Sequence, residues 1–393
     1  MWFAGLLLAA GIAVPVTQRG ARADGPTVAA TGPVPTLATP AGVVVDSAAT
    51  GLPAPPATPA TDDALDGPAP PIPLDGTPLP EGSPSVLWPE ALPLPPSTAL
   101  DGVVLTSSPD RRADLVVVVS IDGLRADALG PWLPTFSRIR REGTSASDAT
   151  TIRMSFTLPS HAAMVSGVDA DQHGLTFNSF RPTFGPIRFP TMFRIARGAG
   201  LTTAMFVGKN KLFHLVEDGG AERFLIAGRD CSRVARRAGA YLRTAAPGLV
   251  FVHFADPDSA GHRRGWMSPL YRQSVVASDA CLGDVLGALE ERGHLDRTLL
   301  IVTADHGGHG RSHGTDAAED RHIPWMAWGG AARAGGNVGR PISTMDTAAT
   351  ALAALGLPTA HGMRGVAVLE ALRDDRAPRR RPRQAGAAAA RRP

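Results

Sequence analysis

The sequence predicts an α/β protein, a three-layer sandwich around a mostly parallel sheet, preceded by a disordered Pro/Ala-rich segment. Short, β-branched apolar runs predict strands at residues 115–120 (LVVVVS), 249–254 (LVFVHF) and 299–303 (LLIVT). Their apolarity is continuous rather than alternating, as in strands that are covered on both faces of a parallel sheet. Helical patterns separate these strands, and that alternation is typical of a sheet lying between two helical layers.

The 393 residues divide by composition into four parts. Residues 1–23 combine an apolar stretch with an Ala-Arg-Ala site, which indicates a signal peptide, with a membrane anchor as the alternative. Residues 24–110 form a Pro/Ala-rich linker that we expect to be disordered, because proline lacks an amide donor and interrupts helices. Residues 111–372 are long enough for one catalytic domain with a large core, and residues 373–393 form a disordered Arg-rich tail.

The charge pattern gives little support to nucleic-acid binding. The formal net charge is +3, and eight arginines lie in the tail at residues 373–393. The sequence has no helix-turn-helix pattern and no aromatic-basic sheet pattern that would support nucleic-acid binding by this tail, so no nucleic-acid partner is expected. We instead expect an exported protein, periplasmic or extracellular, in which the N-terminal segment or the Arg tail could contact the cell envelope.

Inside the folded part, the elements follow in order. Helical periodicity is found at residues 133–142, 160–166, 190–199, 269–292 and 347–355. Phe206 and Val207 indicate a further strand. The two cysteines, Cys231 and Cys281, could pair in an oxidising compartment, but Cys281 also fits a buried free thiol within a helical pattern. Sequence leaves both alternatives open.

Each predicted strand is followed by acidic or histidine residues. Asp122 follows the first strand, Asp258 and His262 follow the second, and Asp305 with His306 follows the third. Ligands of open α/β sheets bind beyond the carboxyl ends of strands, so these side chains are expected at one edge of the sheet. Oxygen and nitrogen donors without cysteine favour a catalytic metal site of the zinc type.

Thr157 stands in the segment FTLPSH, where Pro159 favours the first turn of a helix. A threonine at a helix entrance is by default a cap, and the helix N-terminus there also favours negative charge. Beside a metal cluster, Thr157 is instead expected to be a nucleophile, because a bound metal ion makes an oxygen ligand acidic.

In this order the motifs resemble those of a known family. They are Asp122 in SIDGLRADAL, Thr157 in FTLPSH, Asn178 in HGLTFN, Asp258 and His262 in DPDSAGH, Asp305 and His306 in ADHGG, and His313 in SHGTD. Over about residues 112–370, the chain resembles the nucleotide pyrophosphatase/phosphodiesterase family of the alkaline phosphatase superfamily.

The resemblance implies an alkaline-phosphatase-like fold with two Zn²⁺ ions, other divalent metals being an alternative. One ion would be held by Asp258, His262 and His313, and the other by Asp122, Asp305, His306 and the Thr157 oxygen. Asn178 would donate a hydrogen bond to a phosphoryl oxygen. The implied activity is hydrolysis of a small-molecule phosphate ester through a covalent phospho-threonine on Thr157. His161, His309 and His322 match no ligand position and are expected to have supporting roles.

The choice of substrate stays open in the sequence. Lys209 and Lys211 are the only lysines and resemble the phosphate clamp of some phosphomonoesterases in the superfamily, although a solvated loop is the alternative. Phosphate monoesters and diesters are therefore both expected substrates. The alternatives are phosphonate hydrolysis at the same site and a non-catalytic, metal-containing envelope-binding protein. A sulfatase is disfavoured, because the segment from Thr157 to His161 does not match C/S-x-P-x-R.

Overall fold

The computed structural model describes residues 111–217 and 220–374. The predicted signal peptide (1–23), the predicted linker (24–110) and all but the first two residues of the predicted tail (373–393) lie outside the described residues, as does any envelope contact through them. Within the described ranges, no helix combines membrane-spanning length with sufficient hydropathy.

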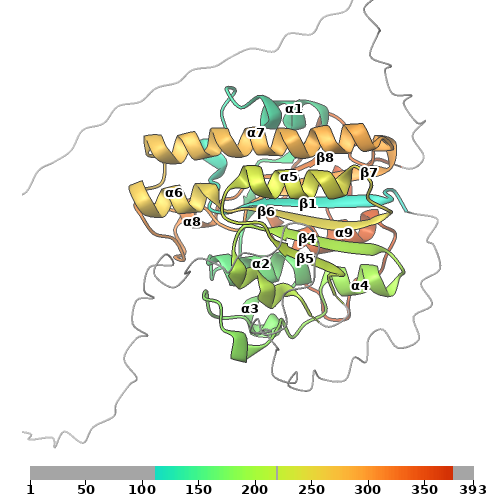
Figure 1. Ribbon diagram of the computed structural model, residues 1–393, viewed down its shortest axis with the longest axis horizontal. Helices are drawn as coiled ribbons and strands as arrows, with labels where there is room; N and C mark the ends of the chain where they lie inside the picture. The colour runs from blue at the N-terminus through green and yellow to red at the C-terminus, as the bar shows by residue number, and fades with distance from the viewer. Residues whose placement is uncertain (1–110, 218–219, 375–393) are drawn as a thin grey trace, which may run out of the picture. The chain divides into compact units, whose positions relative to one another are not determined.

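An eight-stranded sheet forms the centre of the described part (Figure 1). Its strand order is β5-β4-β6-β1-β7-β8-β2-β9, and neighbouring strands are parallel except for the pairs β7–β8 and β8–β2. The strands are β1 (Leu115–Ile121), β2 (Thr144–Ala146), β4 (Thr202–Val207), β5 (Arg223–Ile226), β6 (Gly248–Phe254), β7 (Thr298–Thr303), β8 (Trp325–Trp328) and β9 (Gly336–Val338). A small second sheet pairs β3 (Ala149–Thr150) with β10 (Ile342–Ser343). The predicted mostly parallel sheet is confirmed.

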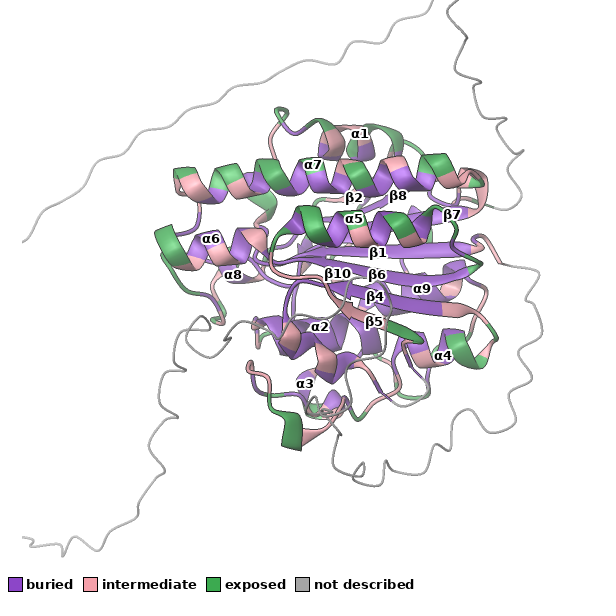
Figure 2. Cartoon of the chain, in the orientation of Figure 1, coloured by how far each residue is buried: buried purple, intermediate pink, exposed green. Residues whose placement is uncertain are grey.

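The three central strands are buried along their whole length, as Figure 2 shows. Strand β1 lies between β6 and β7, and Val118 stands opposite Phe251 on one side and Ile301 on the other. Because side chains on both faces of these strands enter the core, neither face needs polar residues. This explains the continuous apolar runs from which the strands were predicted.

Helices cover both faces of the sheet and complete the three layers (Figure 1). On one face lie α1 (Pro134–Glu142), α5 (Cys231–Leu242) and α7 (Pro269–Arg292). On the other face lie α2 (Thr157–Ser166), α4 (Met192–Gly198) and α9 (Asp346–Ala354). The helix predicted at residues 269–292 coincides with α7, and α2 begins three residues before the predicted start, at Thr157.

Four further α-helices of the described residues were not predicted from the sequence. They are α3 (Ala170–His173), α5, α6 (Asp256–Arg264) and α8 (Ala318–Arg321). The sequence of α6, DPDSAGHRR, has no apolar stripe and contains proline and glycine, which are poor helix formers in a helix interior. Its proline stands in the first turn and its two aspartates also lie there, where both residue types are favourable.

Cys231 and Cys281 form a disulfide bond, with their Cα atoms 6.0 Å apart. The bond joins the first residue of α5 to the middle of α7 on the same face of the sheet. Of the two alternatives that the sequence left open, the structure therefore contains the disulfide and not the free thiol.

Candidate metal centre and active site

Four neighbouring parallel strands bring polar side chains to one edge of the sheet. Strands β4, β6, β1 and β7 are adjacent, so their carboxyl ends lie side by side. Asp122 directly follows β1, and Asp305 lies two residues beyond β7. Lys209 lies two residues beyond β4, and α6 begins just after β6. The sequence predicted that the segments after β1, β6 and β7 meet at one edge of the sheet, and in the structure they do; the segment after β4, with Lys209, lies beside them.

Helix α6 carries Asp258 and His262 four residues apart, and this spacing places both side chains on the same side of the helix. The Asp258 amide donates a hydrogen bond to the Asp122 carbonyl oxygen over 3.0 Å, which joins α6 to the end of β1. Gly123 makes this approach feasible. It has a φ of +71°, and a Cβ atom there would lie 2.8 Å from the Asp258 Cα.

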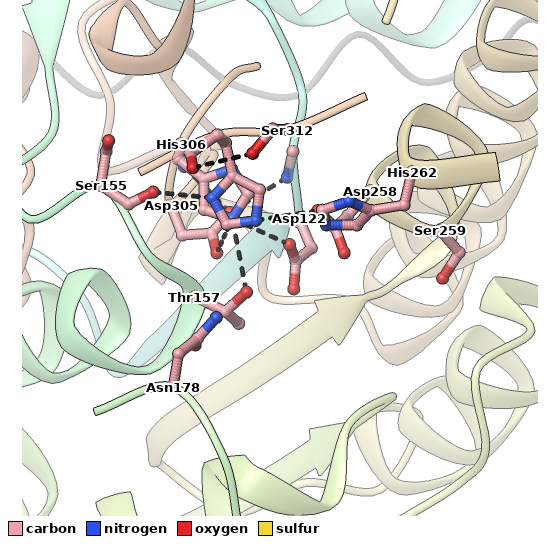
Figure 3. Close-up of polar contacts among 12 residues, drawn as sticks. Asp122, Ser155, Thr157, Asn178, Asp258, Ser259, His262, Asp305, His306 and Ser312 are labelled. Carbon is pink, nitrogen blue, oxygen red and sulfur yellow. Dashed lines mark hydrogen bonds and ion pairs between the residues drawn. The ribbon is translucent and has the colours of Figure 1, made fainter. Parts of the chain in front are cut away.

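At this edge of the sheet, the ligand-type side chains gather in two groups. Within each group the potential ligand atoms lie within 4.8 Å of one another, and all the residues are buried. The groups are Asp258, His306 and His313, and Asp122, Asp305 and His306. Figure 3 shows Asp122, Asp258, Asp305 and His306 turned toward one another, with Thr157 beside them and His262 next to Asp258. His306 belongs to both groups, whereas His262 belongs to neither and has its Nε2 atom 3.3 Å from Asp258 Oδ1.

The three imidazoles share one hydrogen-bonding pattern. Each donates its Nδ1–H to a backbone carbonyl: His306 to Gly307 over 2.8 Å, His313 to Ser155 over 2.9 Å, and His262 to Arg311 over 3.0 Å. A carbonyl oxygen can only accept, so each neutral ring carries its proton on Nδ1 and its lone pair on Nε2. Histidines that bind metal ions are typically held in this way by their second nitrogen.

These Nε2 lone pairs face carboxylate oxygens. His306 Nε2 lies 3.4 Å from Asp122 Oδ1 and 3.3 Å from Asp305 Oδ2, and His313 Nε2 lies 3.6 Å from Asp258 Oδ1. Those three carboxylate oxygens and His262 Nε2 are buried and have no hydrogen-bond partner among the described residues. Acceptors that face acceptors repel one another unless a cation lies between them. The donor set therefore fits metal ions, and its oxygen and nitrogen atoms suit zinc.

Electrostatics distinguish the three carboxyl groups. Burial is the largest single effect and raises the pKa of Asp122 and of Asp258, but the Lys209 ammonium together with the neighbouring histidines keeps each pKa below its ordinary value. Burial and the Asp122 charge raise the pKa of Asp305 well above its ordinary value. One ammonium therefore does not compensate three buried carboxylates, and divalent cations would complete the balance.

His253, in β6, forms a hydrogen bond with Asp122 Oδ2. Its Nδ1 atom accepts from the Gly208 amide over 3.1 Å, so its Nε2 atom carries the proton and donates to Asp122 Oδ2 over 2.9 Å. Sequence reasoning missed this residue. The signal available in the sequence was a single histidine within the otherwise apolar run of β6, and in the structure this histidine is fully buried.

Thr157 is the first residue of α2, and its buried side chain faces the cluster. Its Oγ1 atom lies 3.3 Å from His306 Nε2 and 3.4 Å from Lys209 Nζ. Phe156 is the N-cap residue, so the default expectation that Thr157 is the helix cap is wrong. His161, one turn further along α2, donates from Nδ1 to the Thr157 carbonyl over 2.8 Å and accepts from Ser120 Oγ over 2.8 Å.

Asn178 and Lys209 both follow Thr157 in the sequence, and each contacts its surroundings. Asn178 Oδ1 accepts from the Leu158 amide over 2.9 Å, which leaves its NH₂ group as the donating end. Lys209 Nζ donates to Asp258 Oδ2 over 2.6 Å and lies 3.0 Å from Asp122 Oδ2. The alternative of a solvated loop is wrong for both lysines, because Lys209 and Lys211 are almost fully buried.

Two other histidines are more peripheral. His309 is half-exposed and donates from Nδ1 to the buried carboxylate of Asp320 over 2.7 Å. His322 is exposed and bridges Thr150 as an isolated β-pair. Neither belongs to the two groups of ligand-type residues.

Fold and site define an α/β protein with a donor set for divalent metals beside a threonine hydroxyl. The model of the type I phosphodiesterase / nucleotide pyrophosphatase family matches residues 116–198 and 221–340, more than half of the chain. The chain belongs to this family, which confirms the resemblance seen in the sequence.

Curated relatives are similar at a lower level. Ectonucleotide pyrophosphatase/phosphodiesterase family member 7 of Homo sapiens is 26% identical over 222 residues, 49% of this chain and 47% of that protein. Bis(5'-adenosyl)-triphosphatase enpp4 of Mus musculus is 25% identical over 224 residues, 51% of this chain and 48% of that protein. This chain spans about half the length of the curated relatives it matches.

Solved structures share the fold. Human ectonucleotide pyrophosphatase / phosphodiesterase 5 has a TM-score of 0.58 at 16% identity, covering 66% of this chain and all (100%) of that chain. The phosphonate monoester hydrolase from Silicibacter pomeroyi has a TM-score of 0.50 at 17% identity, covering 64% of this chain and 75% of that chain.

Proposed function

We propose that this protein hydrolyses phosphate monoesters or diesters at two zinc ions, through a covalent phospho-threonine on Thr157. One observation carries the proposal. The Thr157 hydroxyl lies 3.3 Å from His306 Nε2, whose lone pair faces Asp122 Oδ1 and Asp305 Oδ2, two oxygens that have no hydrogen-bond partner among the described residues. Membership of the phosphodiesterase family supports a hydrolase acting on phosphoric ester bonds.

The proposed ligands follow the family pattern and the positions of the side chains. Asp258, His262 and His313 would hold one zinc ion, and Asp122, Asp305, His306 and the Thr157 oxygen would hold the other. The position of His306 within 4.8 Å of members of both groups supports two closely spaced sites. When bound, zinc would supply Lewis-acid catalysis, making an oxygen nucleophile acidic at neutral pH and stabilising the leaving oxygen.

The covalent steps of the proposed reaction take place at the Thr157 side chain. The Thr157 hydroxyl loses its proton and Oγ1 attacks phosphorus, while the ester oxygen leaves with the electron pair of its bond to phosphorus and takes up a proton from solvent, which yields a phospho-threonine and the released alcohol. Water then attacks the phospho-threonine, which restores Thr157 and releases phosphate or a phosphate monoester. The first turn of α2 favours the negative charge that develops next to Thr157.

Substrate binding is assigned to Asn178, Lys209 and Lys211. The NH₂ group of Asn178 would donate to a non-bridging phosphoryl oxygen, because its carbonyl end is already bonded to the Leu158 amide. Lys209 would contribute positive charge from its position 3.4 Å from Thr157 Oγ1. Lys211, buried two residues further along the chain, is assigned to the same phosphate clamp.

Export is proposed together with this activity. The Cys231–Cys281 disulfide supports it, since structural disulfides persist mainly in oxidising compartments. A periplasmic or extracellular location follows, which would place the enzyme where it meets small phosphate esters outside the cytoplasm.

The test uses the purified full chain with chromogenic phosphate monoester, phosphate diester and phosphonate monoester substrates side by side. Zinc-dependent release of product from either phosphate ester is expected. A preparation that binds zinc but turns over none of the three substrates would instead identify a metal-containing binding protein. Turnover of the phosphonate alone would identify the phosphonate hydrolase alternative.

A further inference from the structure

His214 is a fully buried histidine that the proposed chemistry does not use. It lies in the 3-10 helix η4 (Asn210–Leu215), whose N-cap residue is Lys209. Through this helix it belongs to the segment that delivers Lys209 to the site. Neither the metal-ligand groups nor the phosphate clamp includes it.

The ring of His214 bonds to a second segment, residues 179–187, which directly follows Asn178. The Arg181 amide donates to His214 Nε2 over 2.9 Å, and His214 Nδ1 donates to the Gly185 carbonyl over 2.7 Å. The backbone adds a third bond, from the Ile187 amide to the His214 carbonyl over 2.7 Å. One residue therefore satisfies three backbone groups of a segment whose only regular structure is the short 3-10 helix η3 (Pro182–Phe184).

These bonds determine the state of the imidazole. The Gly185 carbonyl can only accept and the Arg181 amide can only donate, so the ring is neutral and carries its proton on Nδ1. Phe177 packs against the ring edge-on with centroids 5.2 Å apart, and Phe180 lies at 5.5 Å. The aromatic contacts fix the ring in the plane that both hydrogen bonds require.

The two segments joined by His214 carry the groups assigned to the phosphoryl oxygens. Asn178 is bonded to the start of α2 through the Leu158 amide, and η4, which follows Lys209, packs against the same helix. Asn178 and Lys209, which stand at the beginnings of the two segments, are 31 positions apart in the chain. Their relative position near Thr157 therefore depends on tertiary bonds, and His214 makes three of them.

We propose that His214 is a positioning residue for phosphate binding, which holds the segment of Asn178 against the segment of Lys209. The proposal rests on the proposed function, because it presumes that Asn178 and Lys209 bind the phosphoryl group. Loss of the ring hydrogen bonds would leave buried backbone groups of the loop without partners, and the loop would rearrange to satisfy them. A displacement of about 1 Å is enough to weaken oriented contacts substantially.

The test compares three variants of the full chain. His214→Phe keeps the aromatic volume but removes both ring hydrogen bonds, whereas His214→Gln supplies one amide donor and one acceptor. His361→Phe is the matched control, because His361 is exposed. For each protein, the inhibition constant of inorganic phosphate, the KM and kcat for a chromogenic phosphate monoester and the zinc content are measured.

His214→Phe is expected to raise the inhibition constant and KM about tenfold at unchanged zinc content, the loss expected for one or two hydrogen bonds. His214→Gln is expected to recover most of the affinity. A folded His214→Phe variant with wild-type phosphate affinity would overturn the proposal. A failure of His214→Gln to recover any affinity lost in His214→Phe would overturn it as well, since packing alone would then explain the loss.

If His214→Phe yields no soluble protein, His214→Asn decides the question. Its shorter amide cannot span both Arg181 and Gly185, so the same rise in the inhibition constant is expected and wild-type affinity would overturn the proposal. The same measurements test the proposed function separately from the role of His214. If the wild-type chain shows no zinc-dependent turnover, that function is wrong, whereas an active wild type with unaltered variants contradicts only the role of His214.

Discussion

Lys209 Nζ lies 2.6 Å from Asp258 Oδ2, and both side chains are almost completely buried. The same ammonium lies 3.0 Å from Asp122 Oδ2, so it joins one proposed ligand of each zinc ion through their outer oxygens. The inner oxygens, Oδ1 of both residues, are the ones without hydrogen-bond partners among the described residues. Lys209 thus fits beside the metal centre and leaves the ligand atoms available.

Lys209→Ala should impair phosphate monoesters more than diesters. A monoester dianion has an additional charged oxygen, and the loss of a charge-assisted hydrogen bond costs about 10- to 100-fold in kcat/KM. Steady-state kinetics with both chromogenic esters measure the difference. Lys209→Arg, which keeps the charge, is the control and should lose less. Equal losses for the two esters would rule out the clamp role.

Thr157→Ala should remove turnover and leave zinc in place. The hydroxyl is the proposed nucleophile, so kcat is expected to fall on the order of 10⁴-fold or more, whereas the carboxylate and imidazole ligands are unchanged. Zinc content by elemental analysis and product release by absorbance measure the two effects. Thr157→Ser, which retains a hydroxyl, should keep part of the activity. Substantial residual turnover in the alanine variant would contradict the assignment.

His173 should make the fold sensitive to mild acid. Burial lowers its pKa to about 4, and its Nδ1 atom accepts from the Leu175 amide over 3.1 Å, a bond that protonation would break. Since the unfolded chain binds this proton near pH 6.5, its contribution is complete above that pH and is lost as the pH falls toward 4. The loss amounts to about 3 kcal/mol of unfolding free energy at most.

Denaturant unfolding between pH 4 and pH 7 measures that loss. The wild-type free energy of unfolding should rise with pH across this interval, and His173→Gln should show a smaller rise. Comparison of the two proteins cancels the contribution of the metal-site histidines, which both contain. Parallel pH profiles would show that His173 does not supply the sensitivity.

The Cys231–Cys281 disulfide should stabilise the domain. It closes a loop with a sequence separation of 50, for which chain entropy gives about 4 kcal/mol. The double variant Cys231→Ala/Cys281→Ala should therefore have a clearly lower Tm than the oxidised wild type. Reductant should lower the wild-type Tm and leave the variant unaffected. A wild-type Tm that does not respond to complete reduction would contradict this contribution.

Much of the fold could be predicted because its signals are local. The continuous apolar runs of β1, β6 and β7 reflect burial on both faces, and α7 has a long helical pattern between clear ends. By contrast, α6 was not recognised as a helix. Its composition is set by the site it faces rather than by an apolar core.

The site was predictable where strand ends carry the chemistry, and less so elsewhere. Asp122 directly follows β1 and Asp305 lies two residues beyond β7, so the parallel sheet brings them together. His253 and His214 act through partners far away in the chain, and sequence gives no sign of such pairs. The contacts of Lys209 with carboxylates likewise could not be predicted from the sequence, because they depend on the register of β4 beside β6.

The most direct measurement is zinc stoichiometry and turnover in one preparation of the full chain. The account predicts two zinc ions per chain, loss of phosphate-ester turnover when a chelator removes them, and recovery when zinc is returned. Full turnover by a metal-free preparation would contradict it, and so would an active enzyme that binds no divalent ion at Asp122, Asp258 and the neighbouring histidines.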